Sequence, residues 1–333
     1  MPIATIPSRR LSAAALAAVG ALALFAAAPA SLRAEVAQEN EADLKPIPSM
    51  AVPLAADTLI NAVAQVGDRL VGAGAWGHVL VSADQGNTWT QVKTPVNVTL
   101  TSIRFVDDKT GFITGHDATI LKTTDGGSTW KLVQYDPQAE TPLFDVFMKD
   151  ANSGFAVGAY SLVKVTADGG ETWTTRTIGD LDMHMNALAR AKDGKVWIAG
   201  EAGHVFVTDA EMSAVQDIET PYSGSFWNVL ALDDGSVLVM GLRGNVWRTA
   251  DNGATWSQSP TGTTASLQAG RQLRDGSVML VGLEGAVLVS KDRGVTFTQV
   301  KRAERTALAT LFERGDGKVL LFGEGGVEGA LTN

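Results

Sequence analysis

Seven short turns carry the residues of this sequence that are best suited to chemistry, and the chemistry that they suit is recognition. Each turn has the form Gly-x-x-small, and successive copies follow at intervals of 41 to 43 residues. Aromatic rings beside charged groups can stack on a partner and pair with its charges. The variable positions of these turns are the candidate binding residues: Trp76, His116, Asp117, Tyr160, Glu201, Arg243, Glu284 and Glu324.

Catalytic motifs are not apparent in the chain. It contains four histidines and no cysteine, and it has no HExxH, no GxSxG and no histidine pair at metal-ligand spacing. Zinc enzymes and serine hydrolases depend on such arrangements. We therefore expect no catalytic residue, no metal and no cofactor. A competing interpretation is that the polar turn residues are only solvated, which leaves Trp76 and Tyr160 as the strongest candidates for binding.

A second repeated motif, the Asp box (Asp-x-Gly-x-Thr-aromatic), is better explained as a structural turn than as a site. Its Asp can accept backbone hydrogen bonds from one to three residues on, its Gly adopts a positive φ, and its aromatic residue can pack between sheets. A calcium loop would need more carboxylates than one per turn. The five copies pair Asp84 with Trp89, Asp125 with Trp130, Asp168 with Trp173, Asp251 with Trp256, and Asp292 with Phe297.

The spacing of the Asp boxes predicts the fold. The interval from Asp168 to Asp251 is twice the others, so a degenerate copy is expected near Asp209. A period of 41 to 43 residues is typical of propeller blades. Each unit also shows four short alternating segments separated by tight turns. We predict an all-β, seven-bladed β-propeller of four-stranded antiparallel blades, with first strands beginning near Leu59, Leu100, Leu143, Met185, Phe226, Leu267 and Leu308.

The last unit, which begins near Leu308, lacks an Asp-box strand. A closed propeller leaves no exposed sheet edge. We therefore predict that residues 49–55, SMAVPLA, complete blade seven as its fourth strand and close the ring. In blades of this kind the Gly-x-x-small turns lie on the face opposite the Asp boxes, around one mouth of the central channel.

The N-terminus has the features of an exported protein. Two arginines precede an uncharged run at 11–28, and small residues offer cleavage sites after Ala30 or Ala34. We predict a signal peptide over 1–34, a flexible acidic leader over 35–48, the propeller over 49–333 and a periplasmic location; an uncleaved membrane anchor is the alternative. Cleavage after Ala34 leaves 24 basic and 36 acidic residues, so no nucleic-acid partner is expected.

Two stretches resemble the photosystem II stability/assembly factor family of seven-bladed Asp-box propellers: GFITGHDATILKTTDGGSTW at 111–130 and GFAVGAYSLVKVTADGGETW at 154–173. The likeness extends over residues 57–333. It implies a non-enzymatic assembly factor that binds membrane-protein subunits. Members from non-photosynthetic bacteria are similar to accessory proteins of resistance-nodulation-division transporters. The resemblance therefore implies a monomeric propeller whose partner is an integral membrane protein or a membrane complex.

Two alternatives remain open at this point. Sialidases also carry Asp boxes, but their chemistry needs three arginines, a Tyr–Glu nucleophile pair and an Asp acid. Tyrosine occurs only at 135, 160 and 222, and sialidases have six blades with irregular box spacing. The other alternative is a carbohydrate-binding propeller, in which Trp76 and Tyr160 would be the platforms on which sugar rings stack.

Overall fold

The computed structural model describes residues 45–178 and 182–331. The chain divides into two units after Lys45, and the strands described here belong to the second unit, Pro46–Asn333. The predicted signal peptide and nearly all of the predicted leader therefore lie outside the described residues, and their boundaries stay predictions. Within the described ranges, no helix is long and apolar enough to cross a membrane.

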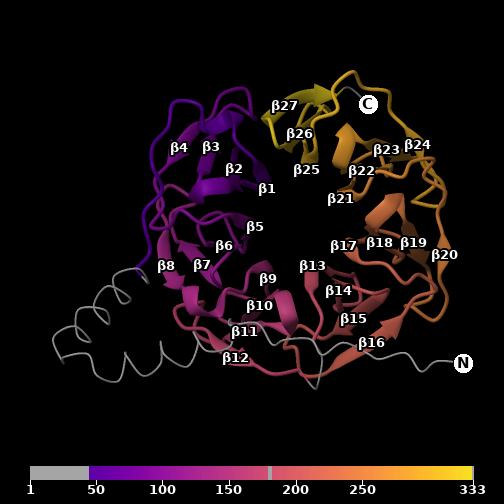
Figure 1. Ribbon diagram of the computed structural model, residues 1–333, viewed down its shortest axis with the longest axis horizontal. Coiled ribbons are helices and arrows are strands. Elements are labelled where there is room, and N and C mark those ends of the chain that lie inside the picture. Colours follow the sequence, from indigo (N-terminus) through magenta and orange to yellow (C-terminus); the bar gives the residue numbers. More distant parts are fainter. Residues whose placement is uncertain (1–44, 179–181, 332–333) are drawn as a thin grey trace, which may run out of the picture. The chain divides into compact units, whose positions relative to one another are not determined.

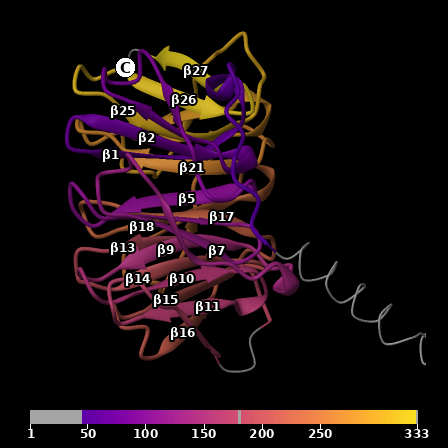
Figure 2. The ribbon, with the colours of Figure 1, turned by 90° about the vertical axis from the view of Figure 1, so that its left-hand side faces the viewer.

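Seven antiparallel sheets surround a central channel, which confirms the predicted seven-bladed propeller (Figure 1). Their first strands lie nearest the axis, and viewed from the side the strands run roughly along it (Figure 2). Within residues 45–178 and 182–331, six sheets have four strands and the seventh has three. The predicted starts of the first strands agree with the structure to within one residue.

The strands of blades one to four are β1 (Ile60–Val66), β2 (Arg69–Gly74), β3 (Val79–Ser82) and β4 (Thr90–Val92); β5 (Leu100–Phe105), β6 (Gly111–Gly115), β7 (Thr119–Thr123) and β8 (Lys131–Gln134); β9 (Leu143–Met148), β10 (Gly154–Gly158), β11 (Val163–Thr166) and β12 (Thr174–Arg176); β13 (Met185–Arg190), β14 (Val196–Gly200), β15 (His204–Thr208) and β16 (Val215–Glu219). Those of blades five to seven are β17 (Phe226–Ala231), β18 (Val237–Gly241), β19 (Val246–Thr249) and β20 (Ser257–Gln258); β21 (Leu267–Gln272), β22 (Val278–Gly282), β23 (Val287–Ser290) and β24 (Thr298–Gln299); β25 (Leu308–Glu313), β26 (Val319–Gly323) and β27 (Gly326–Leu331). Short 3-10 turns are η2 (Ala55–Asp57), η3 (Ala75–Gly77), η4 (Pro137–Ala139), η5 (Ala159–Ser161), η6 (Leu242–Gly244) and η7 (Leu283–Gly285).

The Asp boxes join the third and fourth strands and are structural, as predicted. In blade one, the Thr88 N–H and hydroxyl donate to the two carboxylate oxygens of Asp84 over 2.9 and 2.7 Å. The main donor is therefore four residues on, not one to three. A hydroxyl two residues before the Asp, which the sequence analysis missed, completes the turn: Ser82 Oγ accepts from the Gly86 N–H at 2.7 Å.

The degenerate box predicted at Asp209 is confirmed. The Ser213 N–H donates to Asp209 Oδ1 over 2.8 Å, which is the same bond four residues on. Thr208 keeps a hydroxyl at the strand position of Ser82 but directly precedes the Asp, and it donates to the Ala214 carbonyl over 2.8 Å. Buried Met212 packs into the core between blades three and four. The backbone turn thus survives the loss of the motif because its central carboxylate is retained.

The box aromatics fill the boundaries between blades. Trp173 of blade three packs edge-on against Phe112 of blade two, with ring centroids 6.1 Å apart. Trp89 of blade one packs in the same way on Phe322 of blade seven, at 5.8 Å. Each box therefore contributes an aromatic side chain to the core that it shares with the preceding blade.

The box carboxylates predict how the fold responds to acid. The pKa of Asp84, Asp168 and Asp251 is lowered from 3.8 to about 2, and the largest cause is hydrogen bonding from the threonine four residues on. A depressed pKa adds stability above the unfolded value, and that stability is lost as the pH falls through the folded one. We expect the melting temperature to be flat from about pH 7 to about pH 5 and to fall between about pH 4 and pH 2. Asp168→Asn should flatten that fall, and a loss of stability that begins near neutral pH would contradict the assignment.

Residues 49–55 do not form the predicted strand of blade seven. The Ser49 N–H donates to the Thr94 carbonyl over 3.0 Å, and the Val52 N–H donates to the Gln91 side chain over 2.9 Å. The segment therefore follows the outer side of blade one. That prediction is wrong because the backbone bonds of the segment go to blade one, although Ala55 packs into the core between blades one and seven.

The boundary between blades seven and one is built like the others. Trp89 packs on Phe322, and the Arg314 guanidinium donates to the side-chain oxygen of Asn87, in the Asp box of blade one, over 3.0 Å. Similar links recur elsewhere in the ring: Arg69 of blade one donates to the Gly126 carbonyl in the box of blade two over 2.9 Å. Side-chain packing rather than an exchanged strand therefore closes the ring.

Candidate functional site

The Gly-x-x-small turns join the second and third strands of every blade, at the opposite end of the third strand from the Asp box. Both predicted features of these turns, their place in the blade and their face of the ring, therefore hold. In the six copies of the turn whose third residue is not glycine, that residue has a left-handed backbone, with φ between 52° and 58°. These residues are Trp76, Asp117, Tyr160, Ala202, Arg243 and Glu284.

The fourth position of the turn is small for a steric reason. A Cβ added to Gly77 would lie 1.9 Å from the Val96 carbonyl oxygen, and Gly77 also has a φ of +68°. Blades two and three tolerate Ala118 and Ser161 there. The turn is thus pressed against the connector that leads into the next blade, which leaves the third residue to project outward.

The predicted ring residues occupy two different positions within the turn, the third and the second. Trp76, Tyr160, Arg243 and Glu284 occupy the third position and are exposed, and Asp117 occupies the same position half-buried. His116, Glu201 and Glu324 occupy the second position instead. The third-position residues in blades four and seven are Ala202 and Gly325, so these blades present no large side chain at the outermost point of the turn.

Trp76 and Tyr160 are the unusual members of the ring. Their side chains are 67% and 64% exposed, respectively, among the most exposed large apolar side chains of the described chain. A left-handed backbone is strained for such residues and favours glycine. The same backbone recurs at Ala202, Arg243 and Glu284, so it belongs to the repeated turn, and the exposure of the two aromatic rings is what distinguishes Trp76 and Tyr160.

An aromatic cluster extends from Tyr160 toward the channel. The His184 ring lies 4.8 Å from Tyr160 in an edge-on arrangement and 6.0 Å from Phe144, which lines the channel. The backbone N–H of His184 donates to Glu201 Oε1 over 3.2 Å. The sequence analysis did not select His184, because it lies in a connector between blades and no repeat marks it.

Three charged members of the ring, Asp117, Glu201 and Glu284, interact with neighbouring residues. Arg305 donates to Glu284 over 2.8 Å. Burial and the carboxylate of Asp117 raise the pKa of Tyr135. These groups give the face its local polarity, while the Trp76 and Tyr160 side chains stay largely exposed.

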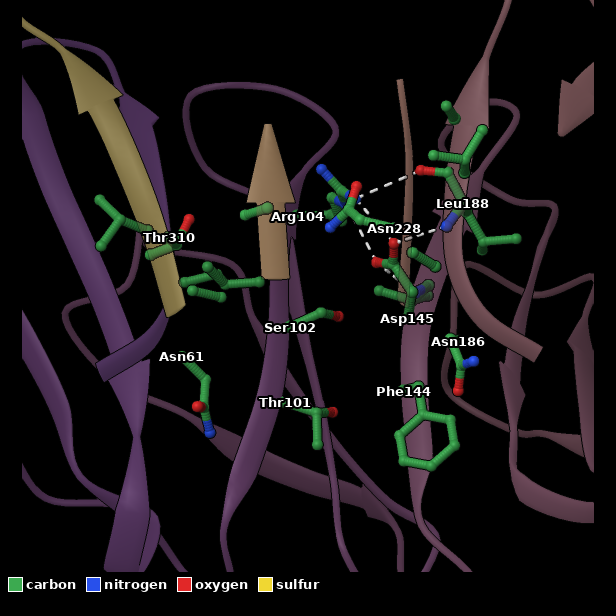
Figure 3. Close-up of a pocket in the computed structure, with 18 of the residues that line it drawn as sticks. Asn61, Thr101, Ser102, Arg104, Phe144, Asp145, Asn186, Leu188, Asn228 and Thr310 are labelled. Carbon is green, nitrogen blue, oxygen red and sulfur yellow. Dashed lines mark hydrogen bonds and ion pairs between the residues drawn. The ribbon is translucent and has the colours of Figure 1, made fainter. Parts of the chain in front are cut away.

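The channel is lined by the first strands, and a repeated bulge positions its side chains (Figure 3). In all seven blades the second residue of the first strand is a β-bulge, which turns that side chain toward the channel. Polar residues there hold the next blade: Asn61 donates to the Leu100 carbonyl, and Asn186 donates to the Phe226 carbonyl, over 2.8 and 2.7 Å. The cavity encloses about 640 Å³.

An ion pair inside the channel joins three blades. Asp145 of blade three accepts from Arg104 of blade two over 3.1 and 2.7 Å and from the Leu188 N–H of blade four over 3.0 Å (Figure 3). The Leu188 N–H donates to Asp145 Oδ2, and the Val146 N–H donates to Asp145 Oδ1. Asp145 raises the pKa of Arg104 by direct charge attraction. With both oxygens engaged, this carboxylate is suited to holding blades together rather than to proton transfer.

No group of three His, Asp or Glu side chains that could hold a metal ion occurs in the part of the chain that the structure describes. The seven-bladed ring, the Asp boxes and the opposite face of turns are therefore the features to compare with known proteins. A model of the photosynthesis system II assembly factor YCF48 family matches residues 81–142 and 132–327. The chain belongs to this family.

Individual relatives are more distant. A photosystem II assembly lipoprotein Ycf48 of Prochlorococcus marinus is 36% identical over 73 residues, which span 21% of this chain and 22% of that protein. The chain thus matches only about a fifth of the length of its curated relatives. A solved structure titled YCF48 bound to D1 peptide has a TM-score of 0.67 at 18% identity, covering 85% of this chain and 96% of that one. Virginiamycin B lyase from Staphylococcus aureus has a TM-score of 0.71 at 10% identity, covering 83% and 96%. These two likenesses show the fold alone.

The strain at Trp76 leads to a prediction about stability. Trp76→Gly should increase the free energy of unfolding by about 1 kcal/mol, because glycine relieves the left-handed backbone and the exposed indole contributes little packing. Ala202→Gly, at the same turn position of blade four, is the matched control and should have a similar effect. Chemical denaturation of the two variants measures it, and a less stable Trp76→Gly would mean that the indole has a structural role.

Proposed function

We propose that the protein is an exported, non-enzymatic propeller that binds a segment of a membrane protein or membrane complex and assists its assembly. Its membership of the YCF48 family supports this proposal. YCF48 has been solved bound to D1 peptide, and we propose that this chain likewise binds a polypeptide segment. The predicted signal peptide places it in the periplasm.

A transporter of the resistance-nodulation-division class is the partner that the sequence resemblance suggests, and it remains part of the proposal. The protein would act as a monomer with no cofactor. The acidic composition favours a partner segment that is neutral or basic, since like charges repel across an interface.

One observation carries the proposal: two aromatic side chains, Trp76 and Tyr160, are held exposed in strained turns around one mouth of the channel. Aromatic residues dominate the binding energy of many protein interfaces. Tyr160 also continues into the cluster with His184 and Phe144, so the aromatic surface reaches the channel itself.

The test is cross-linked capture by the exported chain, residues 35–333, from detergent-solubilised membranes of its own host. A Trp76→Ala, Tyr160→Ala double variant should recover the integral membrane partner at least about tenfold less, as expected for interface aromatics. Val295→Ala is the matched control, because Val295 is also exposed, at 50%, but lies in an Asp box on the other face.

Two outcomes would contradict the proposal. The first is equal recovery of the membrane partner by the double variant and the wild type. The second is release of sugar from a sialic-acid glycoside, which would indicate a glycosidase. Binding of the wild type, but not of the double variant, to an immobilised glycan array would instead favour the carbohydrate-binding alternative.

A further inference from the structure

We propose that the open edge of β27 in blade seven binds an extended segment of a partner protein, which adds to the blade as an antiparallel fourth strand. The inference rests on the proposed function, in that the ligand is a polypeptide. It adds a second contact, made by a strand edge rather than by the turns that carry Trp76 and Tyr160. The chemistry is strand addition, in which backbone hydrogen bonds provide much of the affinity.

The other six blades show what this edge lacks. In each of them a fourth strand of two to five residues pairs with the third strand. The third strand of blade six, β23, is therefore buried except for half-buried Val289, whereas Gly329 and Ala330 of β27 are exposed. In Figure 1, β27 forms the outer boundary of its own blade, beside four-stranded neighbours.

Two contacts anchor β27, which has a β-bulge at Glu328 and Gly329. Arg302, from the connector after blade six, pairs with Glu328 of β27 at 3.4 Å, and both side chains are only 6% exposed. At its first residue, β27 meets η2 so closely that a Cβ on Gly326 would lie 1.8 Å from the Ala56 carbonyl oxygen. An edge anchored at these two points loses little conformational entropy when a strand is added to it.

An exposed apolar segment leads up to this edge. Leu54, which directly precedes η2, is exposed, as are Ile47 and Met50 further along the outer side of blade one. Met50 is fixed there, because its carbonyl accepts from the Gln91 side chain over 2.8 Å. Apolar side chains of an added segment could therefore pack on Leu54 while its backbone pairs with β27.

The charges near the edge favour a partner segment over the protein's own leader. Asp57 and Glu324 are exposed beside the start of β27, and the leader at 35–44, EVAQENEADL, carries four carboxylates and no basic residue. Like charges would repel, and this composition has low strand propensity. A segment with alternating apolar and neutral or basic side chains is the occupant that fits.

The test uses hydrogen exchange of the β27 amides in the exported chain, residues 35–333. The probe is the synthetic peptide STWKLVQ, which is the Asp-box strand of blade two at 128–134. A saturating concentration of this peptide should slow the exchange of residues 328–331 at least about tenfold, as pairing protects an edge. The same peptide with alternate residues replaced by proline, which cannot donate backbone hydrogen bonds, should have no effect.

A completed-blade variant provides the second arm, with residues 123–134 of blade two joined after Leu331. Its β27 amides should exchange slowly without peptide and should not respond to it. Equal effects of the two peptides, no effect of STWKLVQ, or slow exchange that disappears when residues 35–45 are deleted would overturn the inference; the last result would assign the edge to the leader. If the completed variant does not fold, the comparison of the two peptides decides alone.

The inference and the proposed function fail separately. The Trp76→Ala, Tyr160→Ala variant should keep full peptide protection at β27, because these residues lie on the turns and not on this edge. If that variant no longer captures the membrane partner, and the peptide does not slow hydrogen exchange of the β27 amides, the proposed function is supported and the strand addition is contradicted.

Discussion

Asp145→Asn is expected to lower the free energy of unfolding by about 3 kcal/mol, the low end of the range for breaking a buried ion pair. The Asp145 side chain is 4% exposed, whereas Arg104 is 52% exposed to the channel, so the arginine is partly solvated even when unpaired. The substitution also places an amide against the Leu188 N–H. Because Asp145 joins blades two, three and four, chemical denaturation should report the loss for the whole propeller.

Two channel arginines provide the controls for this prediction. Arg104→Met leaves the buried Asp145 carboxylate without its counter-charge and with only the N–H donors of Val146 and Leu188, so its cost should be comparable, about 3 kcal/mol. Arg190, which also lines the channel, stacks over Phe147 at 5.9 Å, and Arg190→Met should cost less than about 1 kcal/mol. Equal losses in Asp145→Asn and Arg190→Met would show that the ion pair has no special role.

Trp173→Ala is the second substitution expected to have a large effect, at about 3–5 kcal/mol of unfolding free energy. The indole is buried against Phe112 of blade two and donates to the Gly170 carbonyl over 3.2 Å. Its removal leaves a cavity at the boundary between two blades, which the rigid turn cannot collapse to fill. Chemical denaturation followed by circular dichroism measures the change.

The chain itself provides the control for Trp173. Blade six has Phe297 at the same box position, also buried, so Trp173→Phe should retain most of the stability. Both variants should capture the membrane partner as well as the wild type at temperatures where they are folded, because the Asp boxes lie on the face away from the turns. A Trp173→Ala variant that is stable but does not bind would contradict the structural role of the boxes.

Repetition is why so much of the fold could be predicted from the sequence. A turn that recurs at Asp84, Asp125, Asp168, Asp251 and Asp292 reveals its local hydrogen bonding and its period, and the period specifies the blade. Even the degenerate copy at Asp209 was found by position and confirmed by its bond to Ser213. Local chemistry repeated at fixed intervals is readable without tertiary information.

The candidate site was predicted less completely, because it depends on register within a turn. Position along the repeat selects Trp76 and Tyr160, which have the left-handed backbone of the turn, whereas His116, Glu201 and Glu324 lie one residue away from that position. His184 was missed, since it reaches Tyr160 from a connector whose length and sequence differ between blades. Such side chains meet only after the ring has formed.

The sequence by itself determined the number of blades, the strand order within each unit and the faces on which the two kinds of turn lie, because these follow from local turns repeated along the chain. Only the tertiary structure decided how the ring closes, which side chains enter the channel and where an edge stays open. Those outcomes depend on long-range partners: Ser49 with Thr94 and Asp145 with Arg104 are 45 and 41 residues apart in sequence. No local pattern specifies such pairings, because their stabilisation arises only when distant blades are already packed together.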